Sequence, residues 1–438
     1  MKKLLLTLCL AVIALAASAY DFAVNGIYYN IINSQTYIDG TKYLIAEVTY
    51  KDTNYNSYSG KVSIPTFVTS GDQKYVVMYI GEKAFYNCTN LTSVQYSSIY
   101  LYYIKDYAFY GCKNLTSLFS LSHTISVGDY AFYGCSSMTE FDSSSQLKSI
   151  GSLAFAYCSS LKSFTLGSKL ATCGTNILKS SGAEDSKLIL NCTCTVSTFA
   201  DSNFDYVEFG TDCTVIPKLP THLKKLTMNS QTIASATYSS ESIIEQAGSK
   251  KLSTVVPDAS YLLIDTLVIG PDVTQIGARA FSYPVHADNS PTVLLIEGKV
   301  SFIGSNAFAA SPIMNLPLPE SLTQMNQFVC VECRRLTTVT IPSSYTFTLS
   351  YVFSGCTNLQ TVFDKTSPGY GASAFSPDNE LLQVFVLTKS AYTNYVNQGY
   401  KRVYLVGDVK TTPDEDVNND GAVDTQDVLK VYDYMKKK

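Results

Sequence analysis

The sequence has no tryptophan and only three histidines among its 438 residues. So few histidines leave little material for a histidine-based metal centre or catalytic site. Charged residues make up 16% of the chain, below the ~25% usual in soluble domains, and the formal net charge is −4. The basic footprint of a nucleic-acid-binding protein is therefore missing, and nucleic acid is not an expected partner.

Long apolar runs are missing as well, except at the beginning of the chain. Lys2 and Lys3 precede an apolar stretch over residues 4–16, and the small residues Ala17-Ser18-Ala19 follow it. The stretch is shorter than the ~20 apolar residues of a membrane-spanning helix. It is typical of a secretory signal peptide. We therefore expect residues 1–19 to be removed and the mature chain to be secreted, extracellular or at the cell surface, with no membrane span.

Sequence signatures of enzymes are also missing. The chain contains no Gly-x-Ser-x-Gly nucleophile elbow, no His-Glu-x-x-His zinc motif and no phosphate-binding P-loop. No local pattern supports a Cys–His pair either. The sequence therefore predicts a protein that is not an enzyme and has no catalytic residues.

A repeat dominates what is present. The pattern apolar-x-x-x-Ala-Phe-x-x-Cys occurs at Ile80–Cys88, Ile104–Cys112, Val127–Cys135 and Ile150–Cys158. The cysteines of successive copies are 23 or 24 residues apart, and weaker copies end at Cys333 and Cys356. This period lies in the ~20–29-residue range of leucine-rich repeats, whose coils stack and bury a shared core. The sequence therefore predicts an α/β-type repeat solenoid with short parallel strands.

Stacking would place equivalent residues of successive coils about 4.8 Å apart. The expected aromatic column consists of Phe85, Phe109, Phe132 and Phe155. The small Ala before each Phe leaves room for the ring, and Gly after Ile, as in Ile80-Gly81, suits a turn with positive φ. In the strand over residues 161–166 we expect Phe164 to face inward and Ser163 and Thr165 to face outward.

The cysteines of the copies are predicted to be buried thiols. Stacked neighbours lie about one coil apart, which exceeds the ~3.8 Å Cβ separation of a disulfide, and a buried thiol behaves as a small apolar group. Two alternatives, a disulfide or a metal cluster, remain open for Cys173, Cys192, Cys194 and Cys213. Cys330 and Cys333 form a CxxC pair, but the place of Cys333 in the column argues against redox chemistry.

The pattern Ile80-Gly81-x-x-Ala84-Phe85-x-x-Cys88-x-x-Leu91 resembles the BspA-like leucine-rich repeats of bacterial and protist surface proteins. The resemblance implies a right-handed leucine-rich repeat solenoid over residues 79–382, a β-rich N-terminal cap over 20–78 and a C-terminal cap over 383–407. The C-terminal cap reads as strand, short helix and strand. The family implies extracellular recognition, as adhesion to host or microbial proteins or glycans, and no catalysis.

The middle of the repeat region departs from this pattern. Residues 172–260 keep scattered leucines but lose the Ala-Phe signature. Either divergent coils continue the solenoid or a break separates two arrays. Continuity is favoured, because each coil needs a neighbour to bury its apolar side.

The C-terminal residues carry a different motif. After a polar linker over 408–415, residues 416–427 match a twelve-residue calcium loop, in which Gly421 allows the sharp turn. The expected Ca²⁺ ligands are Asp416, Asn418, Asp420, the Ala422 carbonyl, Asp424 and Asp427. An apolar stripe over residues 428–435 predicts a small helix after the loop. The alternative is an acidic turn without an ion.

With Asp427 at loop position 12 and Val423 inside the loop, residues 416–438 resemble one half of a type I dockerin. The resemblance implies docking to a cohesin through Thr425 and Gln426. Dockerins carry two such loops, and only 11 residues follow Asp427. A small calcium-ordered terminal module is therefore the favoured interpretation.

Outward strand positions of successive coils suggest a ligand stripe. The equivalent positions are Gln95, Phe119, Asp142 and Thr165. Such a stripe suits contact with a protein or glycan, and a solvated strand face is the alternative. Of the 33 tyrosines, 19 lie between Tyr20 and Tyr133. This enrichment is typical of contact surfaces, although aromatic strands in a cap explain it too.

Together these features predict a secreted or cell-surface binding protein for extracellular proteins or glycans. The alternative is a cohesin-docked component of an extracellular polysaccharide-degrading or surface complex. A purely structural surface-layer component is a third interpretation.

Overall fold

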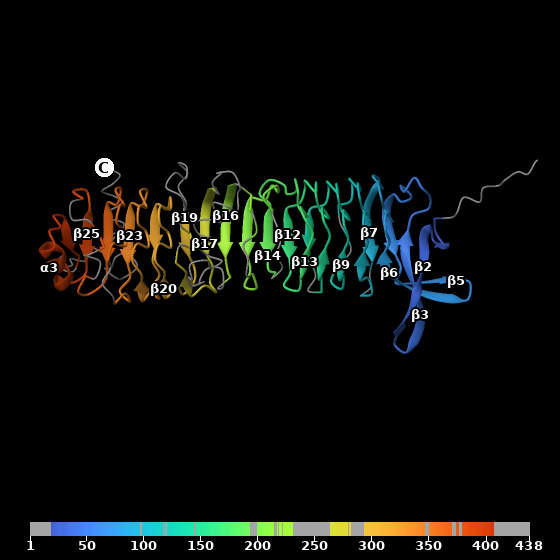
Figure 1. The fold of residues 1–438 in the computed structure, drawn as a ribbon, viewed down its shortest axis with the longest axis horizontal. Helices are drawn as coiled ribbons and strands as arrows, with labels where there is room; N and C mark the ends of the chain where they lie inside the picture. Colours follow the sequence, from blue (N-terminus) through green and yellow to red (C-terminus); the bar gives the residue numbers. More distant parts are fainter. Residues whose placement is uncertain are drawn as a thin grey trace, which may run out of the picture. The chain divides into compact units, whose positions relative to one another are not determined.

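The computed structural model describes residues 19–406, except 97–98, 117, 119–120, 144–145, 193–198, 214–216, 218, 221, 231–262, 279, 282–292, 347–349, 370–373 and 376–378. The expected signal peptide, apart from its last residue, and the expected calcium module lie outside the described residues. The chain forms two compact units. Unit 1 is Met1–Ser163 with Lys169–Ala183, and unit 2 is Phe164–Ser168 with Glu184–Lys438. Within each unit the strands follow one another as the rungs of a β-solenoid (Figure 1).

Unit 1 begins with hairpins. Its first strands are β1 (Phe22–Val24), β2 (Ile27–Ile38), β3 (Thr41–Thr49), β4 (Gly60–Ile64), β5 (Phe67–Ser70) and β6 (Gln73–Ile80). β1, β2 and β3 pair antiparallel, and Asp39 and Gly40, both with positive φ, form the tight turn between β2 and β3. β3 then pairs parallel with β6. The pairing thus changes from hairpins to stacked coils at β6.

Parallel coils follow in unit 1. Their strands are β7 (Leu91–Tyr96), β8 (Tyr103–Ile104), β9 (Ser126–Val127), β10 (Glu140–Asp142), β11 (Ser149–Ile150) and β13 (Thr172–Cys173). β6, β8, β9, β11 and β13 form one parallel row. Ser126 pairs with Ser149, 23 residues later, so one repeat of the sequence makes one coil. The predicted solenoid is confirmed.

The phenylalanine of each repeat lies in the core of unit 1. Phe85, Phe109, Phe132 and Phe155 are fully buried. Their rings stack in series, with centroids 4.8, 5.0 and 5.0 Å apart and planes within 13° of parallel. The alanine before each of them is also fully buried, which leaves space for the ring of the next coil. The predicted aromatic column is confirmed.

The column cysteines are free and buried, as predicted, but they are more than apolar filling. In three successive coils of unit 1 the thiol donates a hydrogen bond to the carbonyl oxygen of the phenylalanine one coil earlier. These bonds run from Cys112 to Phe85 at 2.9 Å, from Cys135 to Phe109 at 3.2 Å and from Cys158 to Phe132 at 3.2 Å. Ser181 takes the same place in the following coil, where its hydroxyl donates to the Phe155 carbonyl at 2.6 Å. The position therefore requires a small donor rather than sulfur itself.

The prediction of a positive φ at glycine after isoleucine is wrong. Gly81 and Gly151 do not have left-handed backbone. At these two positions glycine is required because adjacent coils approach too closely for a side chain. A Cβ on Gly81 would lie 2.7 Å from the Val48 carbonyl oxygen, and one on Gly151 would lie 2.4 Å from the backbone nitrogen of Asp129.

Unit 2 is also built of parallel coils. One row comprises β14 (Lys187–Leu190), β15 (Tyr206–Phe209), β16 (His222–Met228), β17 (Leu263–Ile269) and β19 (Val293–Ile296). A second comprises β18 (Gln275–Ile276), β20 (Phe302–Ile303) and β22 (Gln324–Met325). A third comprises β21 (Asn315–Pro317), β23 (Thr338–Ile341), β24 (Thr361–Asp364), β25 (Gln383–Val386) and β26 (Val403–Leu405).

The described part of the divergent stretch continues the solenoid. β14, β15 and β16 lie within it and pair parallel with one another, and β16 pairs with β17 beyond it. Their inward residues, such as Leu188, Val207 and Leu226, are buried. The favoured alternative thus holds for the coils up to residue 230. In the strand β12 (Ser163–Leu166), Phe164 is fully buried and its two neighbours are half-buried, also as predicted.

Turns rather than helices connect the strands of the described coils, so the expected α/β character gives way to a β-solenoid. The reason is the length of the repeat, because short strands and tight turns take up its 23 residues. The described α-helix, α3 (Lys389–Asn397), lies between β25 and β26, in the strand–helix–strand order that the sequence indicates. The Thr388 side chain caps it by accepting from the Ala391 backbone N–H at 3.1 Å.

Candidate binding face

Each coil of unit 1 turns through six residues whose first and fifth members have left-handed backbone. The first position is occupied by Lys83, Tyr107, Tyr130, Leu153 and Asn176, with φ from 54° to 57°. The fifth is occupied by Asn87, Gly111, Gly134, Tyr157 and Ser180, with φ from 52° to 73°. Left-handed backbone costs a bulky residue ~1–2 kcal/mol relative to glycine. Large side chains at these positions are therefore retained against a local strain.

Six half-buried or exposed tyrosines on these turns form what we call the tyrosine face. Its members are Tyr86, Tyr107, Tyr110, Tyr130, Tyr133 and Tyr157. Tyr86, Tyr110 and Tyr133 stack in one row, with centroids 4.8 Å apart at each step and planes within 9° of parallel. Tyr107 and Tyr130 make a second stacked pair at 4.9 Å and 3°. The two rows touch, since the Tyr130 and Tyr133 centroids lie 5.7 Å apart.

Tyr157 ends the first row differently. In its coil Ala156 occupies the position that follows the column phenylalanine, where the earlier coils have tyrosine. Tyr157 comes from the next position, the left-handed one, with φ 61°. Its ring is therefore inclined by 56° to that of Tyr133, at a centroid distance of 5.0 Å, and 40% of the residue is exposed.

Further aromatic residues and one ion pair border the face. The Lys83 ammonium lies 5.9 Å from the Tyr55 ring centroid and 5.7 Å from that of Tyr107, in cation–π geometry. It also pairs with Glu82 at 3.1 Å, and this bond raises the pKa of Lys83. Burial and the neighbouring phenols raise the pKa of Tyr110, so the hydroxyl is protonated and can both donate and accept near neutral pH.

The acidic residues beside the face are engaged by the backbone. One Asp106 carboxylate oxygen accepts from the Asp129 backbone N–H at 2.8 Å, and one of Asp129 accepts from the Ser152 backbone N–H at 2.7 Å. Each aspartate thus holds the next coil in register. These carboxylates therefore stabilise the contact between coils, and one oxygen of each is already used for that contact.

The structure describes only part of the predicted ligand stripe. Gln95 on β7 and Asp142 on β10 are exposed in unit 1, as expected of outward positions. Thr165 belongs to unit 2, and Phe119 lies outside the described residues. The stripe therefore stays a prediction.

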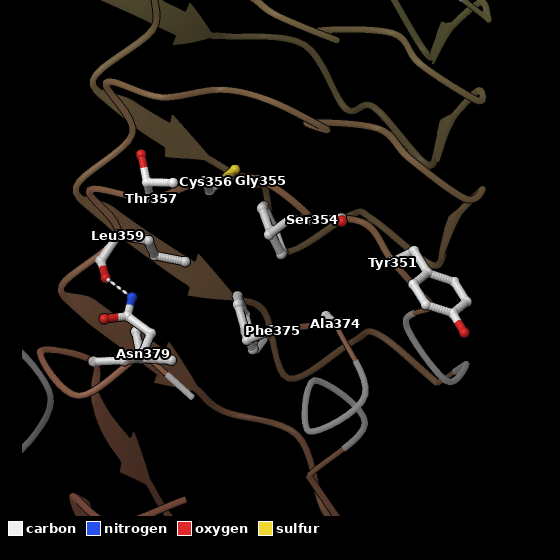
Figure 2. Close-up of a pocket in the computed structure, with 11 residues that line it drawn as sticks. Tyr351, Ser354, Gly355, Cys356, Thr357, Leu359, Ala374, Phe375 and Asn379 are labelled. Atoms are coloured by element: carbon white, nitrogen blue, oxygen red, sulfur yellow. Dashed lines mark hydrogen bonds between the residues drawn. The ribbon is translucent and has the colours of Figure 1, made fainter. Parts of the chain in front are cut away.

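A hollow in unit 2 is a further candidate. It has a volume of about 620 Å³ and lies beside the rings of Phe353 and Phe375, which stack at 4.9 Å. Figure 2 shows the Asn379 amide turned toward the Leu359 carbonyl, to which it donates at 2.8 Å. A hydrogen bond with Cys333 and burial both raise the pKa of the free Cys356 thiol in the lining far above its ordinary value. A neutral thiol of this kind is a poor nucleophile.

The described residues contain no cluster of three or more potential metal ligands. Among them, Cys173, Cys192 and Cys213 are not joined to one another by disulfides. The remaining member of the set, Cys194, lies outside the described residues, so the alternatives for the whole set stay predictions. The calcium ligands Asp416 to Asp427 and the docking residues Thr425 and Gln426 also fall outside them. None of the helices in the described part of the chain combines the length and apolarity needed for a membrane crossing.

Comparison with known proteins agrees with the coil geometry. The model of the BspA-type leucine-rich repeat region matches six copies, over residues 78–208 and 274–393. The chain belongs to the BspA-type leucine-rich repeat family. No curated protein is significantly similar to it. The tyrosine face lies within the first block of BspA-type repeats.

Several solved structures are similar to the chain. A leucine-rich repeat protein from Bacteroides ovatus is 18% identical over 84% of this chain and 100% of its own, with a TM-score of 0.35. A leucine-rich cell surface protein from Faecalibacterium prausnitzii is 18% identical over 88% and 94%, with a TM-score of 0.33. The pneumococcal vaccine antigen PcpA is 16% identical over 89% and 99%, with a TM-score of 0.32. Likeness at this level bears on neither ligand nor mechanism.

Sequence reasoning noted the early enrichment in tyrosine but missed the tyrosine face. The signal was present in the BspA-type repeats, because Tyr86, Tyr110 and Tyr133 each follow the column phenylalanine directly. What the sequence did not show is that this position points outward beside the left-handed one. The two rows meet only because both positions lie on the same turn.

Proposed function

We propose that this BspA-type repeat protein is a secreted or cell-surface binding protein that recognises an extracellular protein or glycan and carries out no catalysis. The observation that supports it most is the tyrosine face, a set of aromatic side chains held in fixed rows by a stacked backbone. Tyrosine offers a large contact area and a polar hydroxyl at low entropic cost, which suits recognition. Solenoids serve broadly as binding scaffolds, because successive coils repeat one surface.

The unit 2 turns support a binding role for these tyrosines. At the position after the column residue, the three corresponding turns of unit 2 have Ala309, Val331 and Ser354. The same backbone is thus built without tyrosine, and the fold does not demand it. Side chains that the fold does not require are candidates for recognition.

An array of glycans and extracellular matrix proteins, probed with the full chain, tests the proposal. We expect capture by at least one class, and loss of capture in the double variant Tyr110→Ser, Tyr133→Ser, which copies Ser354. The control is Tyr392→Ser, at an exposed position of α3 in unit 2 that does not line the hollow. Capture that survives the double variant and vanishes in the control would place the binding surface elsewhere.

The C-terminal motif favours a second candidate function, attachment to a partner through calcium. We propose that Asp416, Asn418, Asp420, Ala422, Asp424 and Asp427 bind Ca²⁺ and order the terminal helix. Support comes from the donor set, since carboxylate and carbonyl oxygens are the ligands that Ca²⁺ prefers. Docking to a cohesin through Thr425 and Gln426 is the more specific alternative. Calorimetric titration with Ca²⁺, with Asp416→Ala as the control, tests the site, and calcium-dependent capture by a cohesin tests the docking.

A further inference from the structure

The tyrosine face presents ring edges and hydroxyls rather than open ring faces. In the row Tyr86, Tyr110 and Tyr133 the planes are within 9° of parallel and 4.8 Å apart, so each ring covers its neighbour. The outer side of Tyr86 meets the edge of Tyr55, at 5.6 Å and 64°. A ligand approaching this row therefore meets a regular series of phenol groups, one from each coil. We call this series, Tyr86, Tyr110 and Tyr133, the comb.

The pitch of this comb limits what can bind along it. Successive phenol rings are about one β-strand spacing apart, because the spacing of the coils sets the distance between them. A ligand that meets each coil in the same way must repeat at this interval. An extended peptide advances ~3.3 Å per residue, which is shorter than the coil spacing, so its contacts drift out of step with the coils. An extended polysaccharide advances by one pyranose ring, which is about as long as one coil is thick.

The charges around the comb favour a neutral ligand. Lys83 is paired with Glu82, and the carboxylates of Asp106 and Asp129 each accept a backbone N–H from the next coil. Among the described residues of these coils, no lysine or arginine recurs from coil to coil along the tyrosine rows. A sulfated, phosphorylated or uronic-acid polymer would need such a row of cations. A neutral, hydroxyl-rich chain needs only the donors and acceptors that phenols supply.

Tyr157 supplies an inclined, exposed ring at the end of the row. Its 56° inclination leaves it unstacked on Tyr133, and 40% of the residue is exposed. The face of an aromatic ring is negative, and the C–H groups on one side of a pyranose are weakly positive, so the two attract when they lie flat on one another. Tyr157 thus adds an anchor for one sugar ring at the end of the comb.

We infer that the tyrosine face binds an extended, neutral, β-linked polysaccharide that runs from coil to coil, with one sugar ring on Tyr157 and the following rings hydrogen-bonded to the hydroxyls of Tyr133, Tyr110 and Tyr86. The inference rests on the proposed binding function and names its ligand class. The row of hydroxyls sets the direction in which the glycan runs across the coils. Tyr157 sets which sugar ring lies on which coil.

Calorimetry with defined oligosaccharides tests this inference on the full chain. The probes are linear β-linked hexasaccharides of glucose, mannose and xylose, an α-linked glucose hexasaccharide and an oligogalacturonate. We expect binding of at least one neutral β-linked probe and none of the α-linked or anionic ones. The affinity should be the same at low and high salt, because no charge on the ligand is screened.

Three variants separate the two parts of the face. Tyr157→Ala should weaken binding at least tenfold by removing the stacking ring. The double variant Tyr110→Phe, Tyr133→Phe keeps the stacked rings and removes two hydroxyls, and should weaken binding by about tenfold. Tyr392→Ala, at an exposed position of α3 in unit 2 that does not line the hollow, is the control and should leave the affinity unchanged. Circular dichroism confirms that each variant is folded.

The outcomes distinguish this inference from the proposed function. Capture of matrix proteins or anionic glycans through the tyrosine face, with no binding of neutral β-linked probes, overturns the inference and leaves the binding function standing. Absence of binding to every probe and every array member overturns both. Binding of a neutral probe that Tyr157→Ala and the Phe double variant leave intact overturns the assignment of the face.

Discussion

The six-residue turns of the two units follow the same backbone path. In unit 2 the first position is left-handed at Asn306, Phe328 and Tyr351, and the fifth is left-handed at Ala310, Glu332 and Gly355. The hydrogen bonds to the next coil also correspond, since the Phe109 N–H donates to the Ala131 carbonyl at 2.7 Å and the Phe308 N–H to the Val329 carbonyl at 2.8 Å. The outward side chains differ, because tyrosine follows the column residue in three of the five turns of unit 1 and in none of these three described turns of unit 2.

The comparison separates what builds a coil from what decorates it. Buried residues at the second, third and sixth positions, together with two left-handed residues, suffice for the turn. The residue at the fourth position varies between turns, so tyrosine there changes the surface of the coil without being needed for the fold. We expect changes in the column to destabilise either unit, and changes in the tyrosine rows to alter binding more than stability.

The largest effect is expected from emptying the aromatic column. Phe132→Ala in unit 1 and Phe308→Ala in unit 2 each remove a fully buried ring, and each should lower the free energy of unfolding by about 3–5 kcal/mol. Urea denaturation measures both. A loss below about 1 kcal/mol in one of them would show that the two columns are not equivalent.

The buried thiols should make unit 1 sensitive to alkali. Burial raises the pKa of Cys88 from 9.0 to about 11, so the unfolded chain ionises first and stability is lost as the pH rises from 9 toward 11. Between pH 8 and 10 this thiol should contribute a loss of about 1.3 kcal/mol. Urea midpoints of the wild type and of Cys88→Ser, which does not titrate, measure the difference. Equal losses in both would rule out the thiol as the cause.

Removal of a tyrosine should cost less than removal of a column residue. Tyr133→Ser installs the side chain found at Ser354 and should lower the free energy of unfolding by about 1 kcal/mol, the value of a surface aromatic stack. Thermal unfolding beside Phe132→Ala provides the measurement. If the two losses were equal, tyrosine would belong to the fold and the comparison would break.

The smallest effect is expected from relieving strain at a left-handed residue. Leu153 has φ 54°, and Asn306 occupies the equivalent position in unit 2 with φ 58°. Asparagine tolerates this backbone, so Leu153→Asn should raise the free energy of unfolding by about 0.5 kcal/mol. Leu153→Ala, which keeps the Cβ and its clash, is the control and should give no gain in the same urea titration.

Much of the fold could be predicted from the sequence, because burial leaves a trace in residue type. Phe85, Cys112 and their equivalents recur every 23 or 24 residues, and that interval implies stacked coils. The role of Gly81 was misread, because glycine is needed there to avoid a clash with the Val48 carbonyl of another coil. The thiol-to-carbonyl bonds were missed for the same reason, since the acceptor of Cys112 lies 27 residues away. The calcium loop and the ligand stripe stay predictions.

Periodicity alone determines that the chain coils, because an isolated coil cannot bury its apolar side and a regular repeat supplies identical neighbours. Which side chains share a surface was settled only by three-dimensional packing. The left-handed turns place two sets of tyrosines on one side of the coils. The coil spacing then stacks the rings of each set, with centroids of successive rings 4.8–4.9 Å apart. Ring orientation, and with it the open face of Tyr157, depends on backbone angles and contacts between coils that exist only in the folded stack.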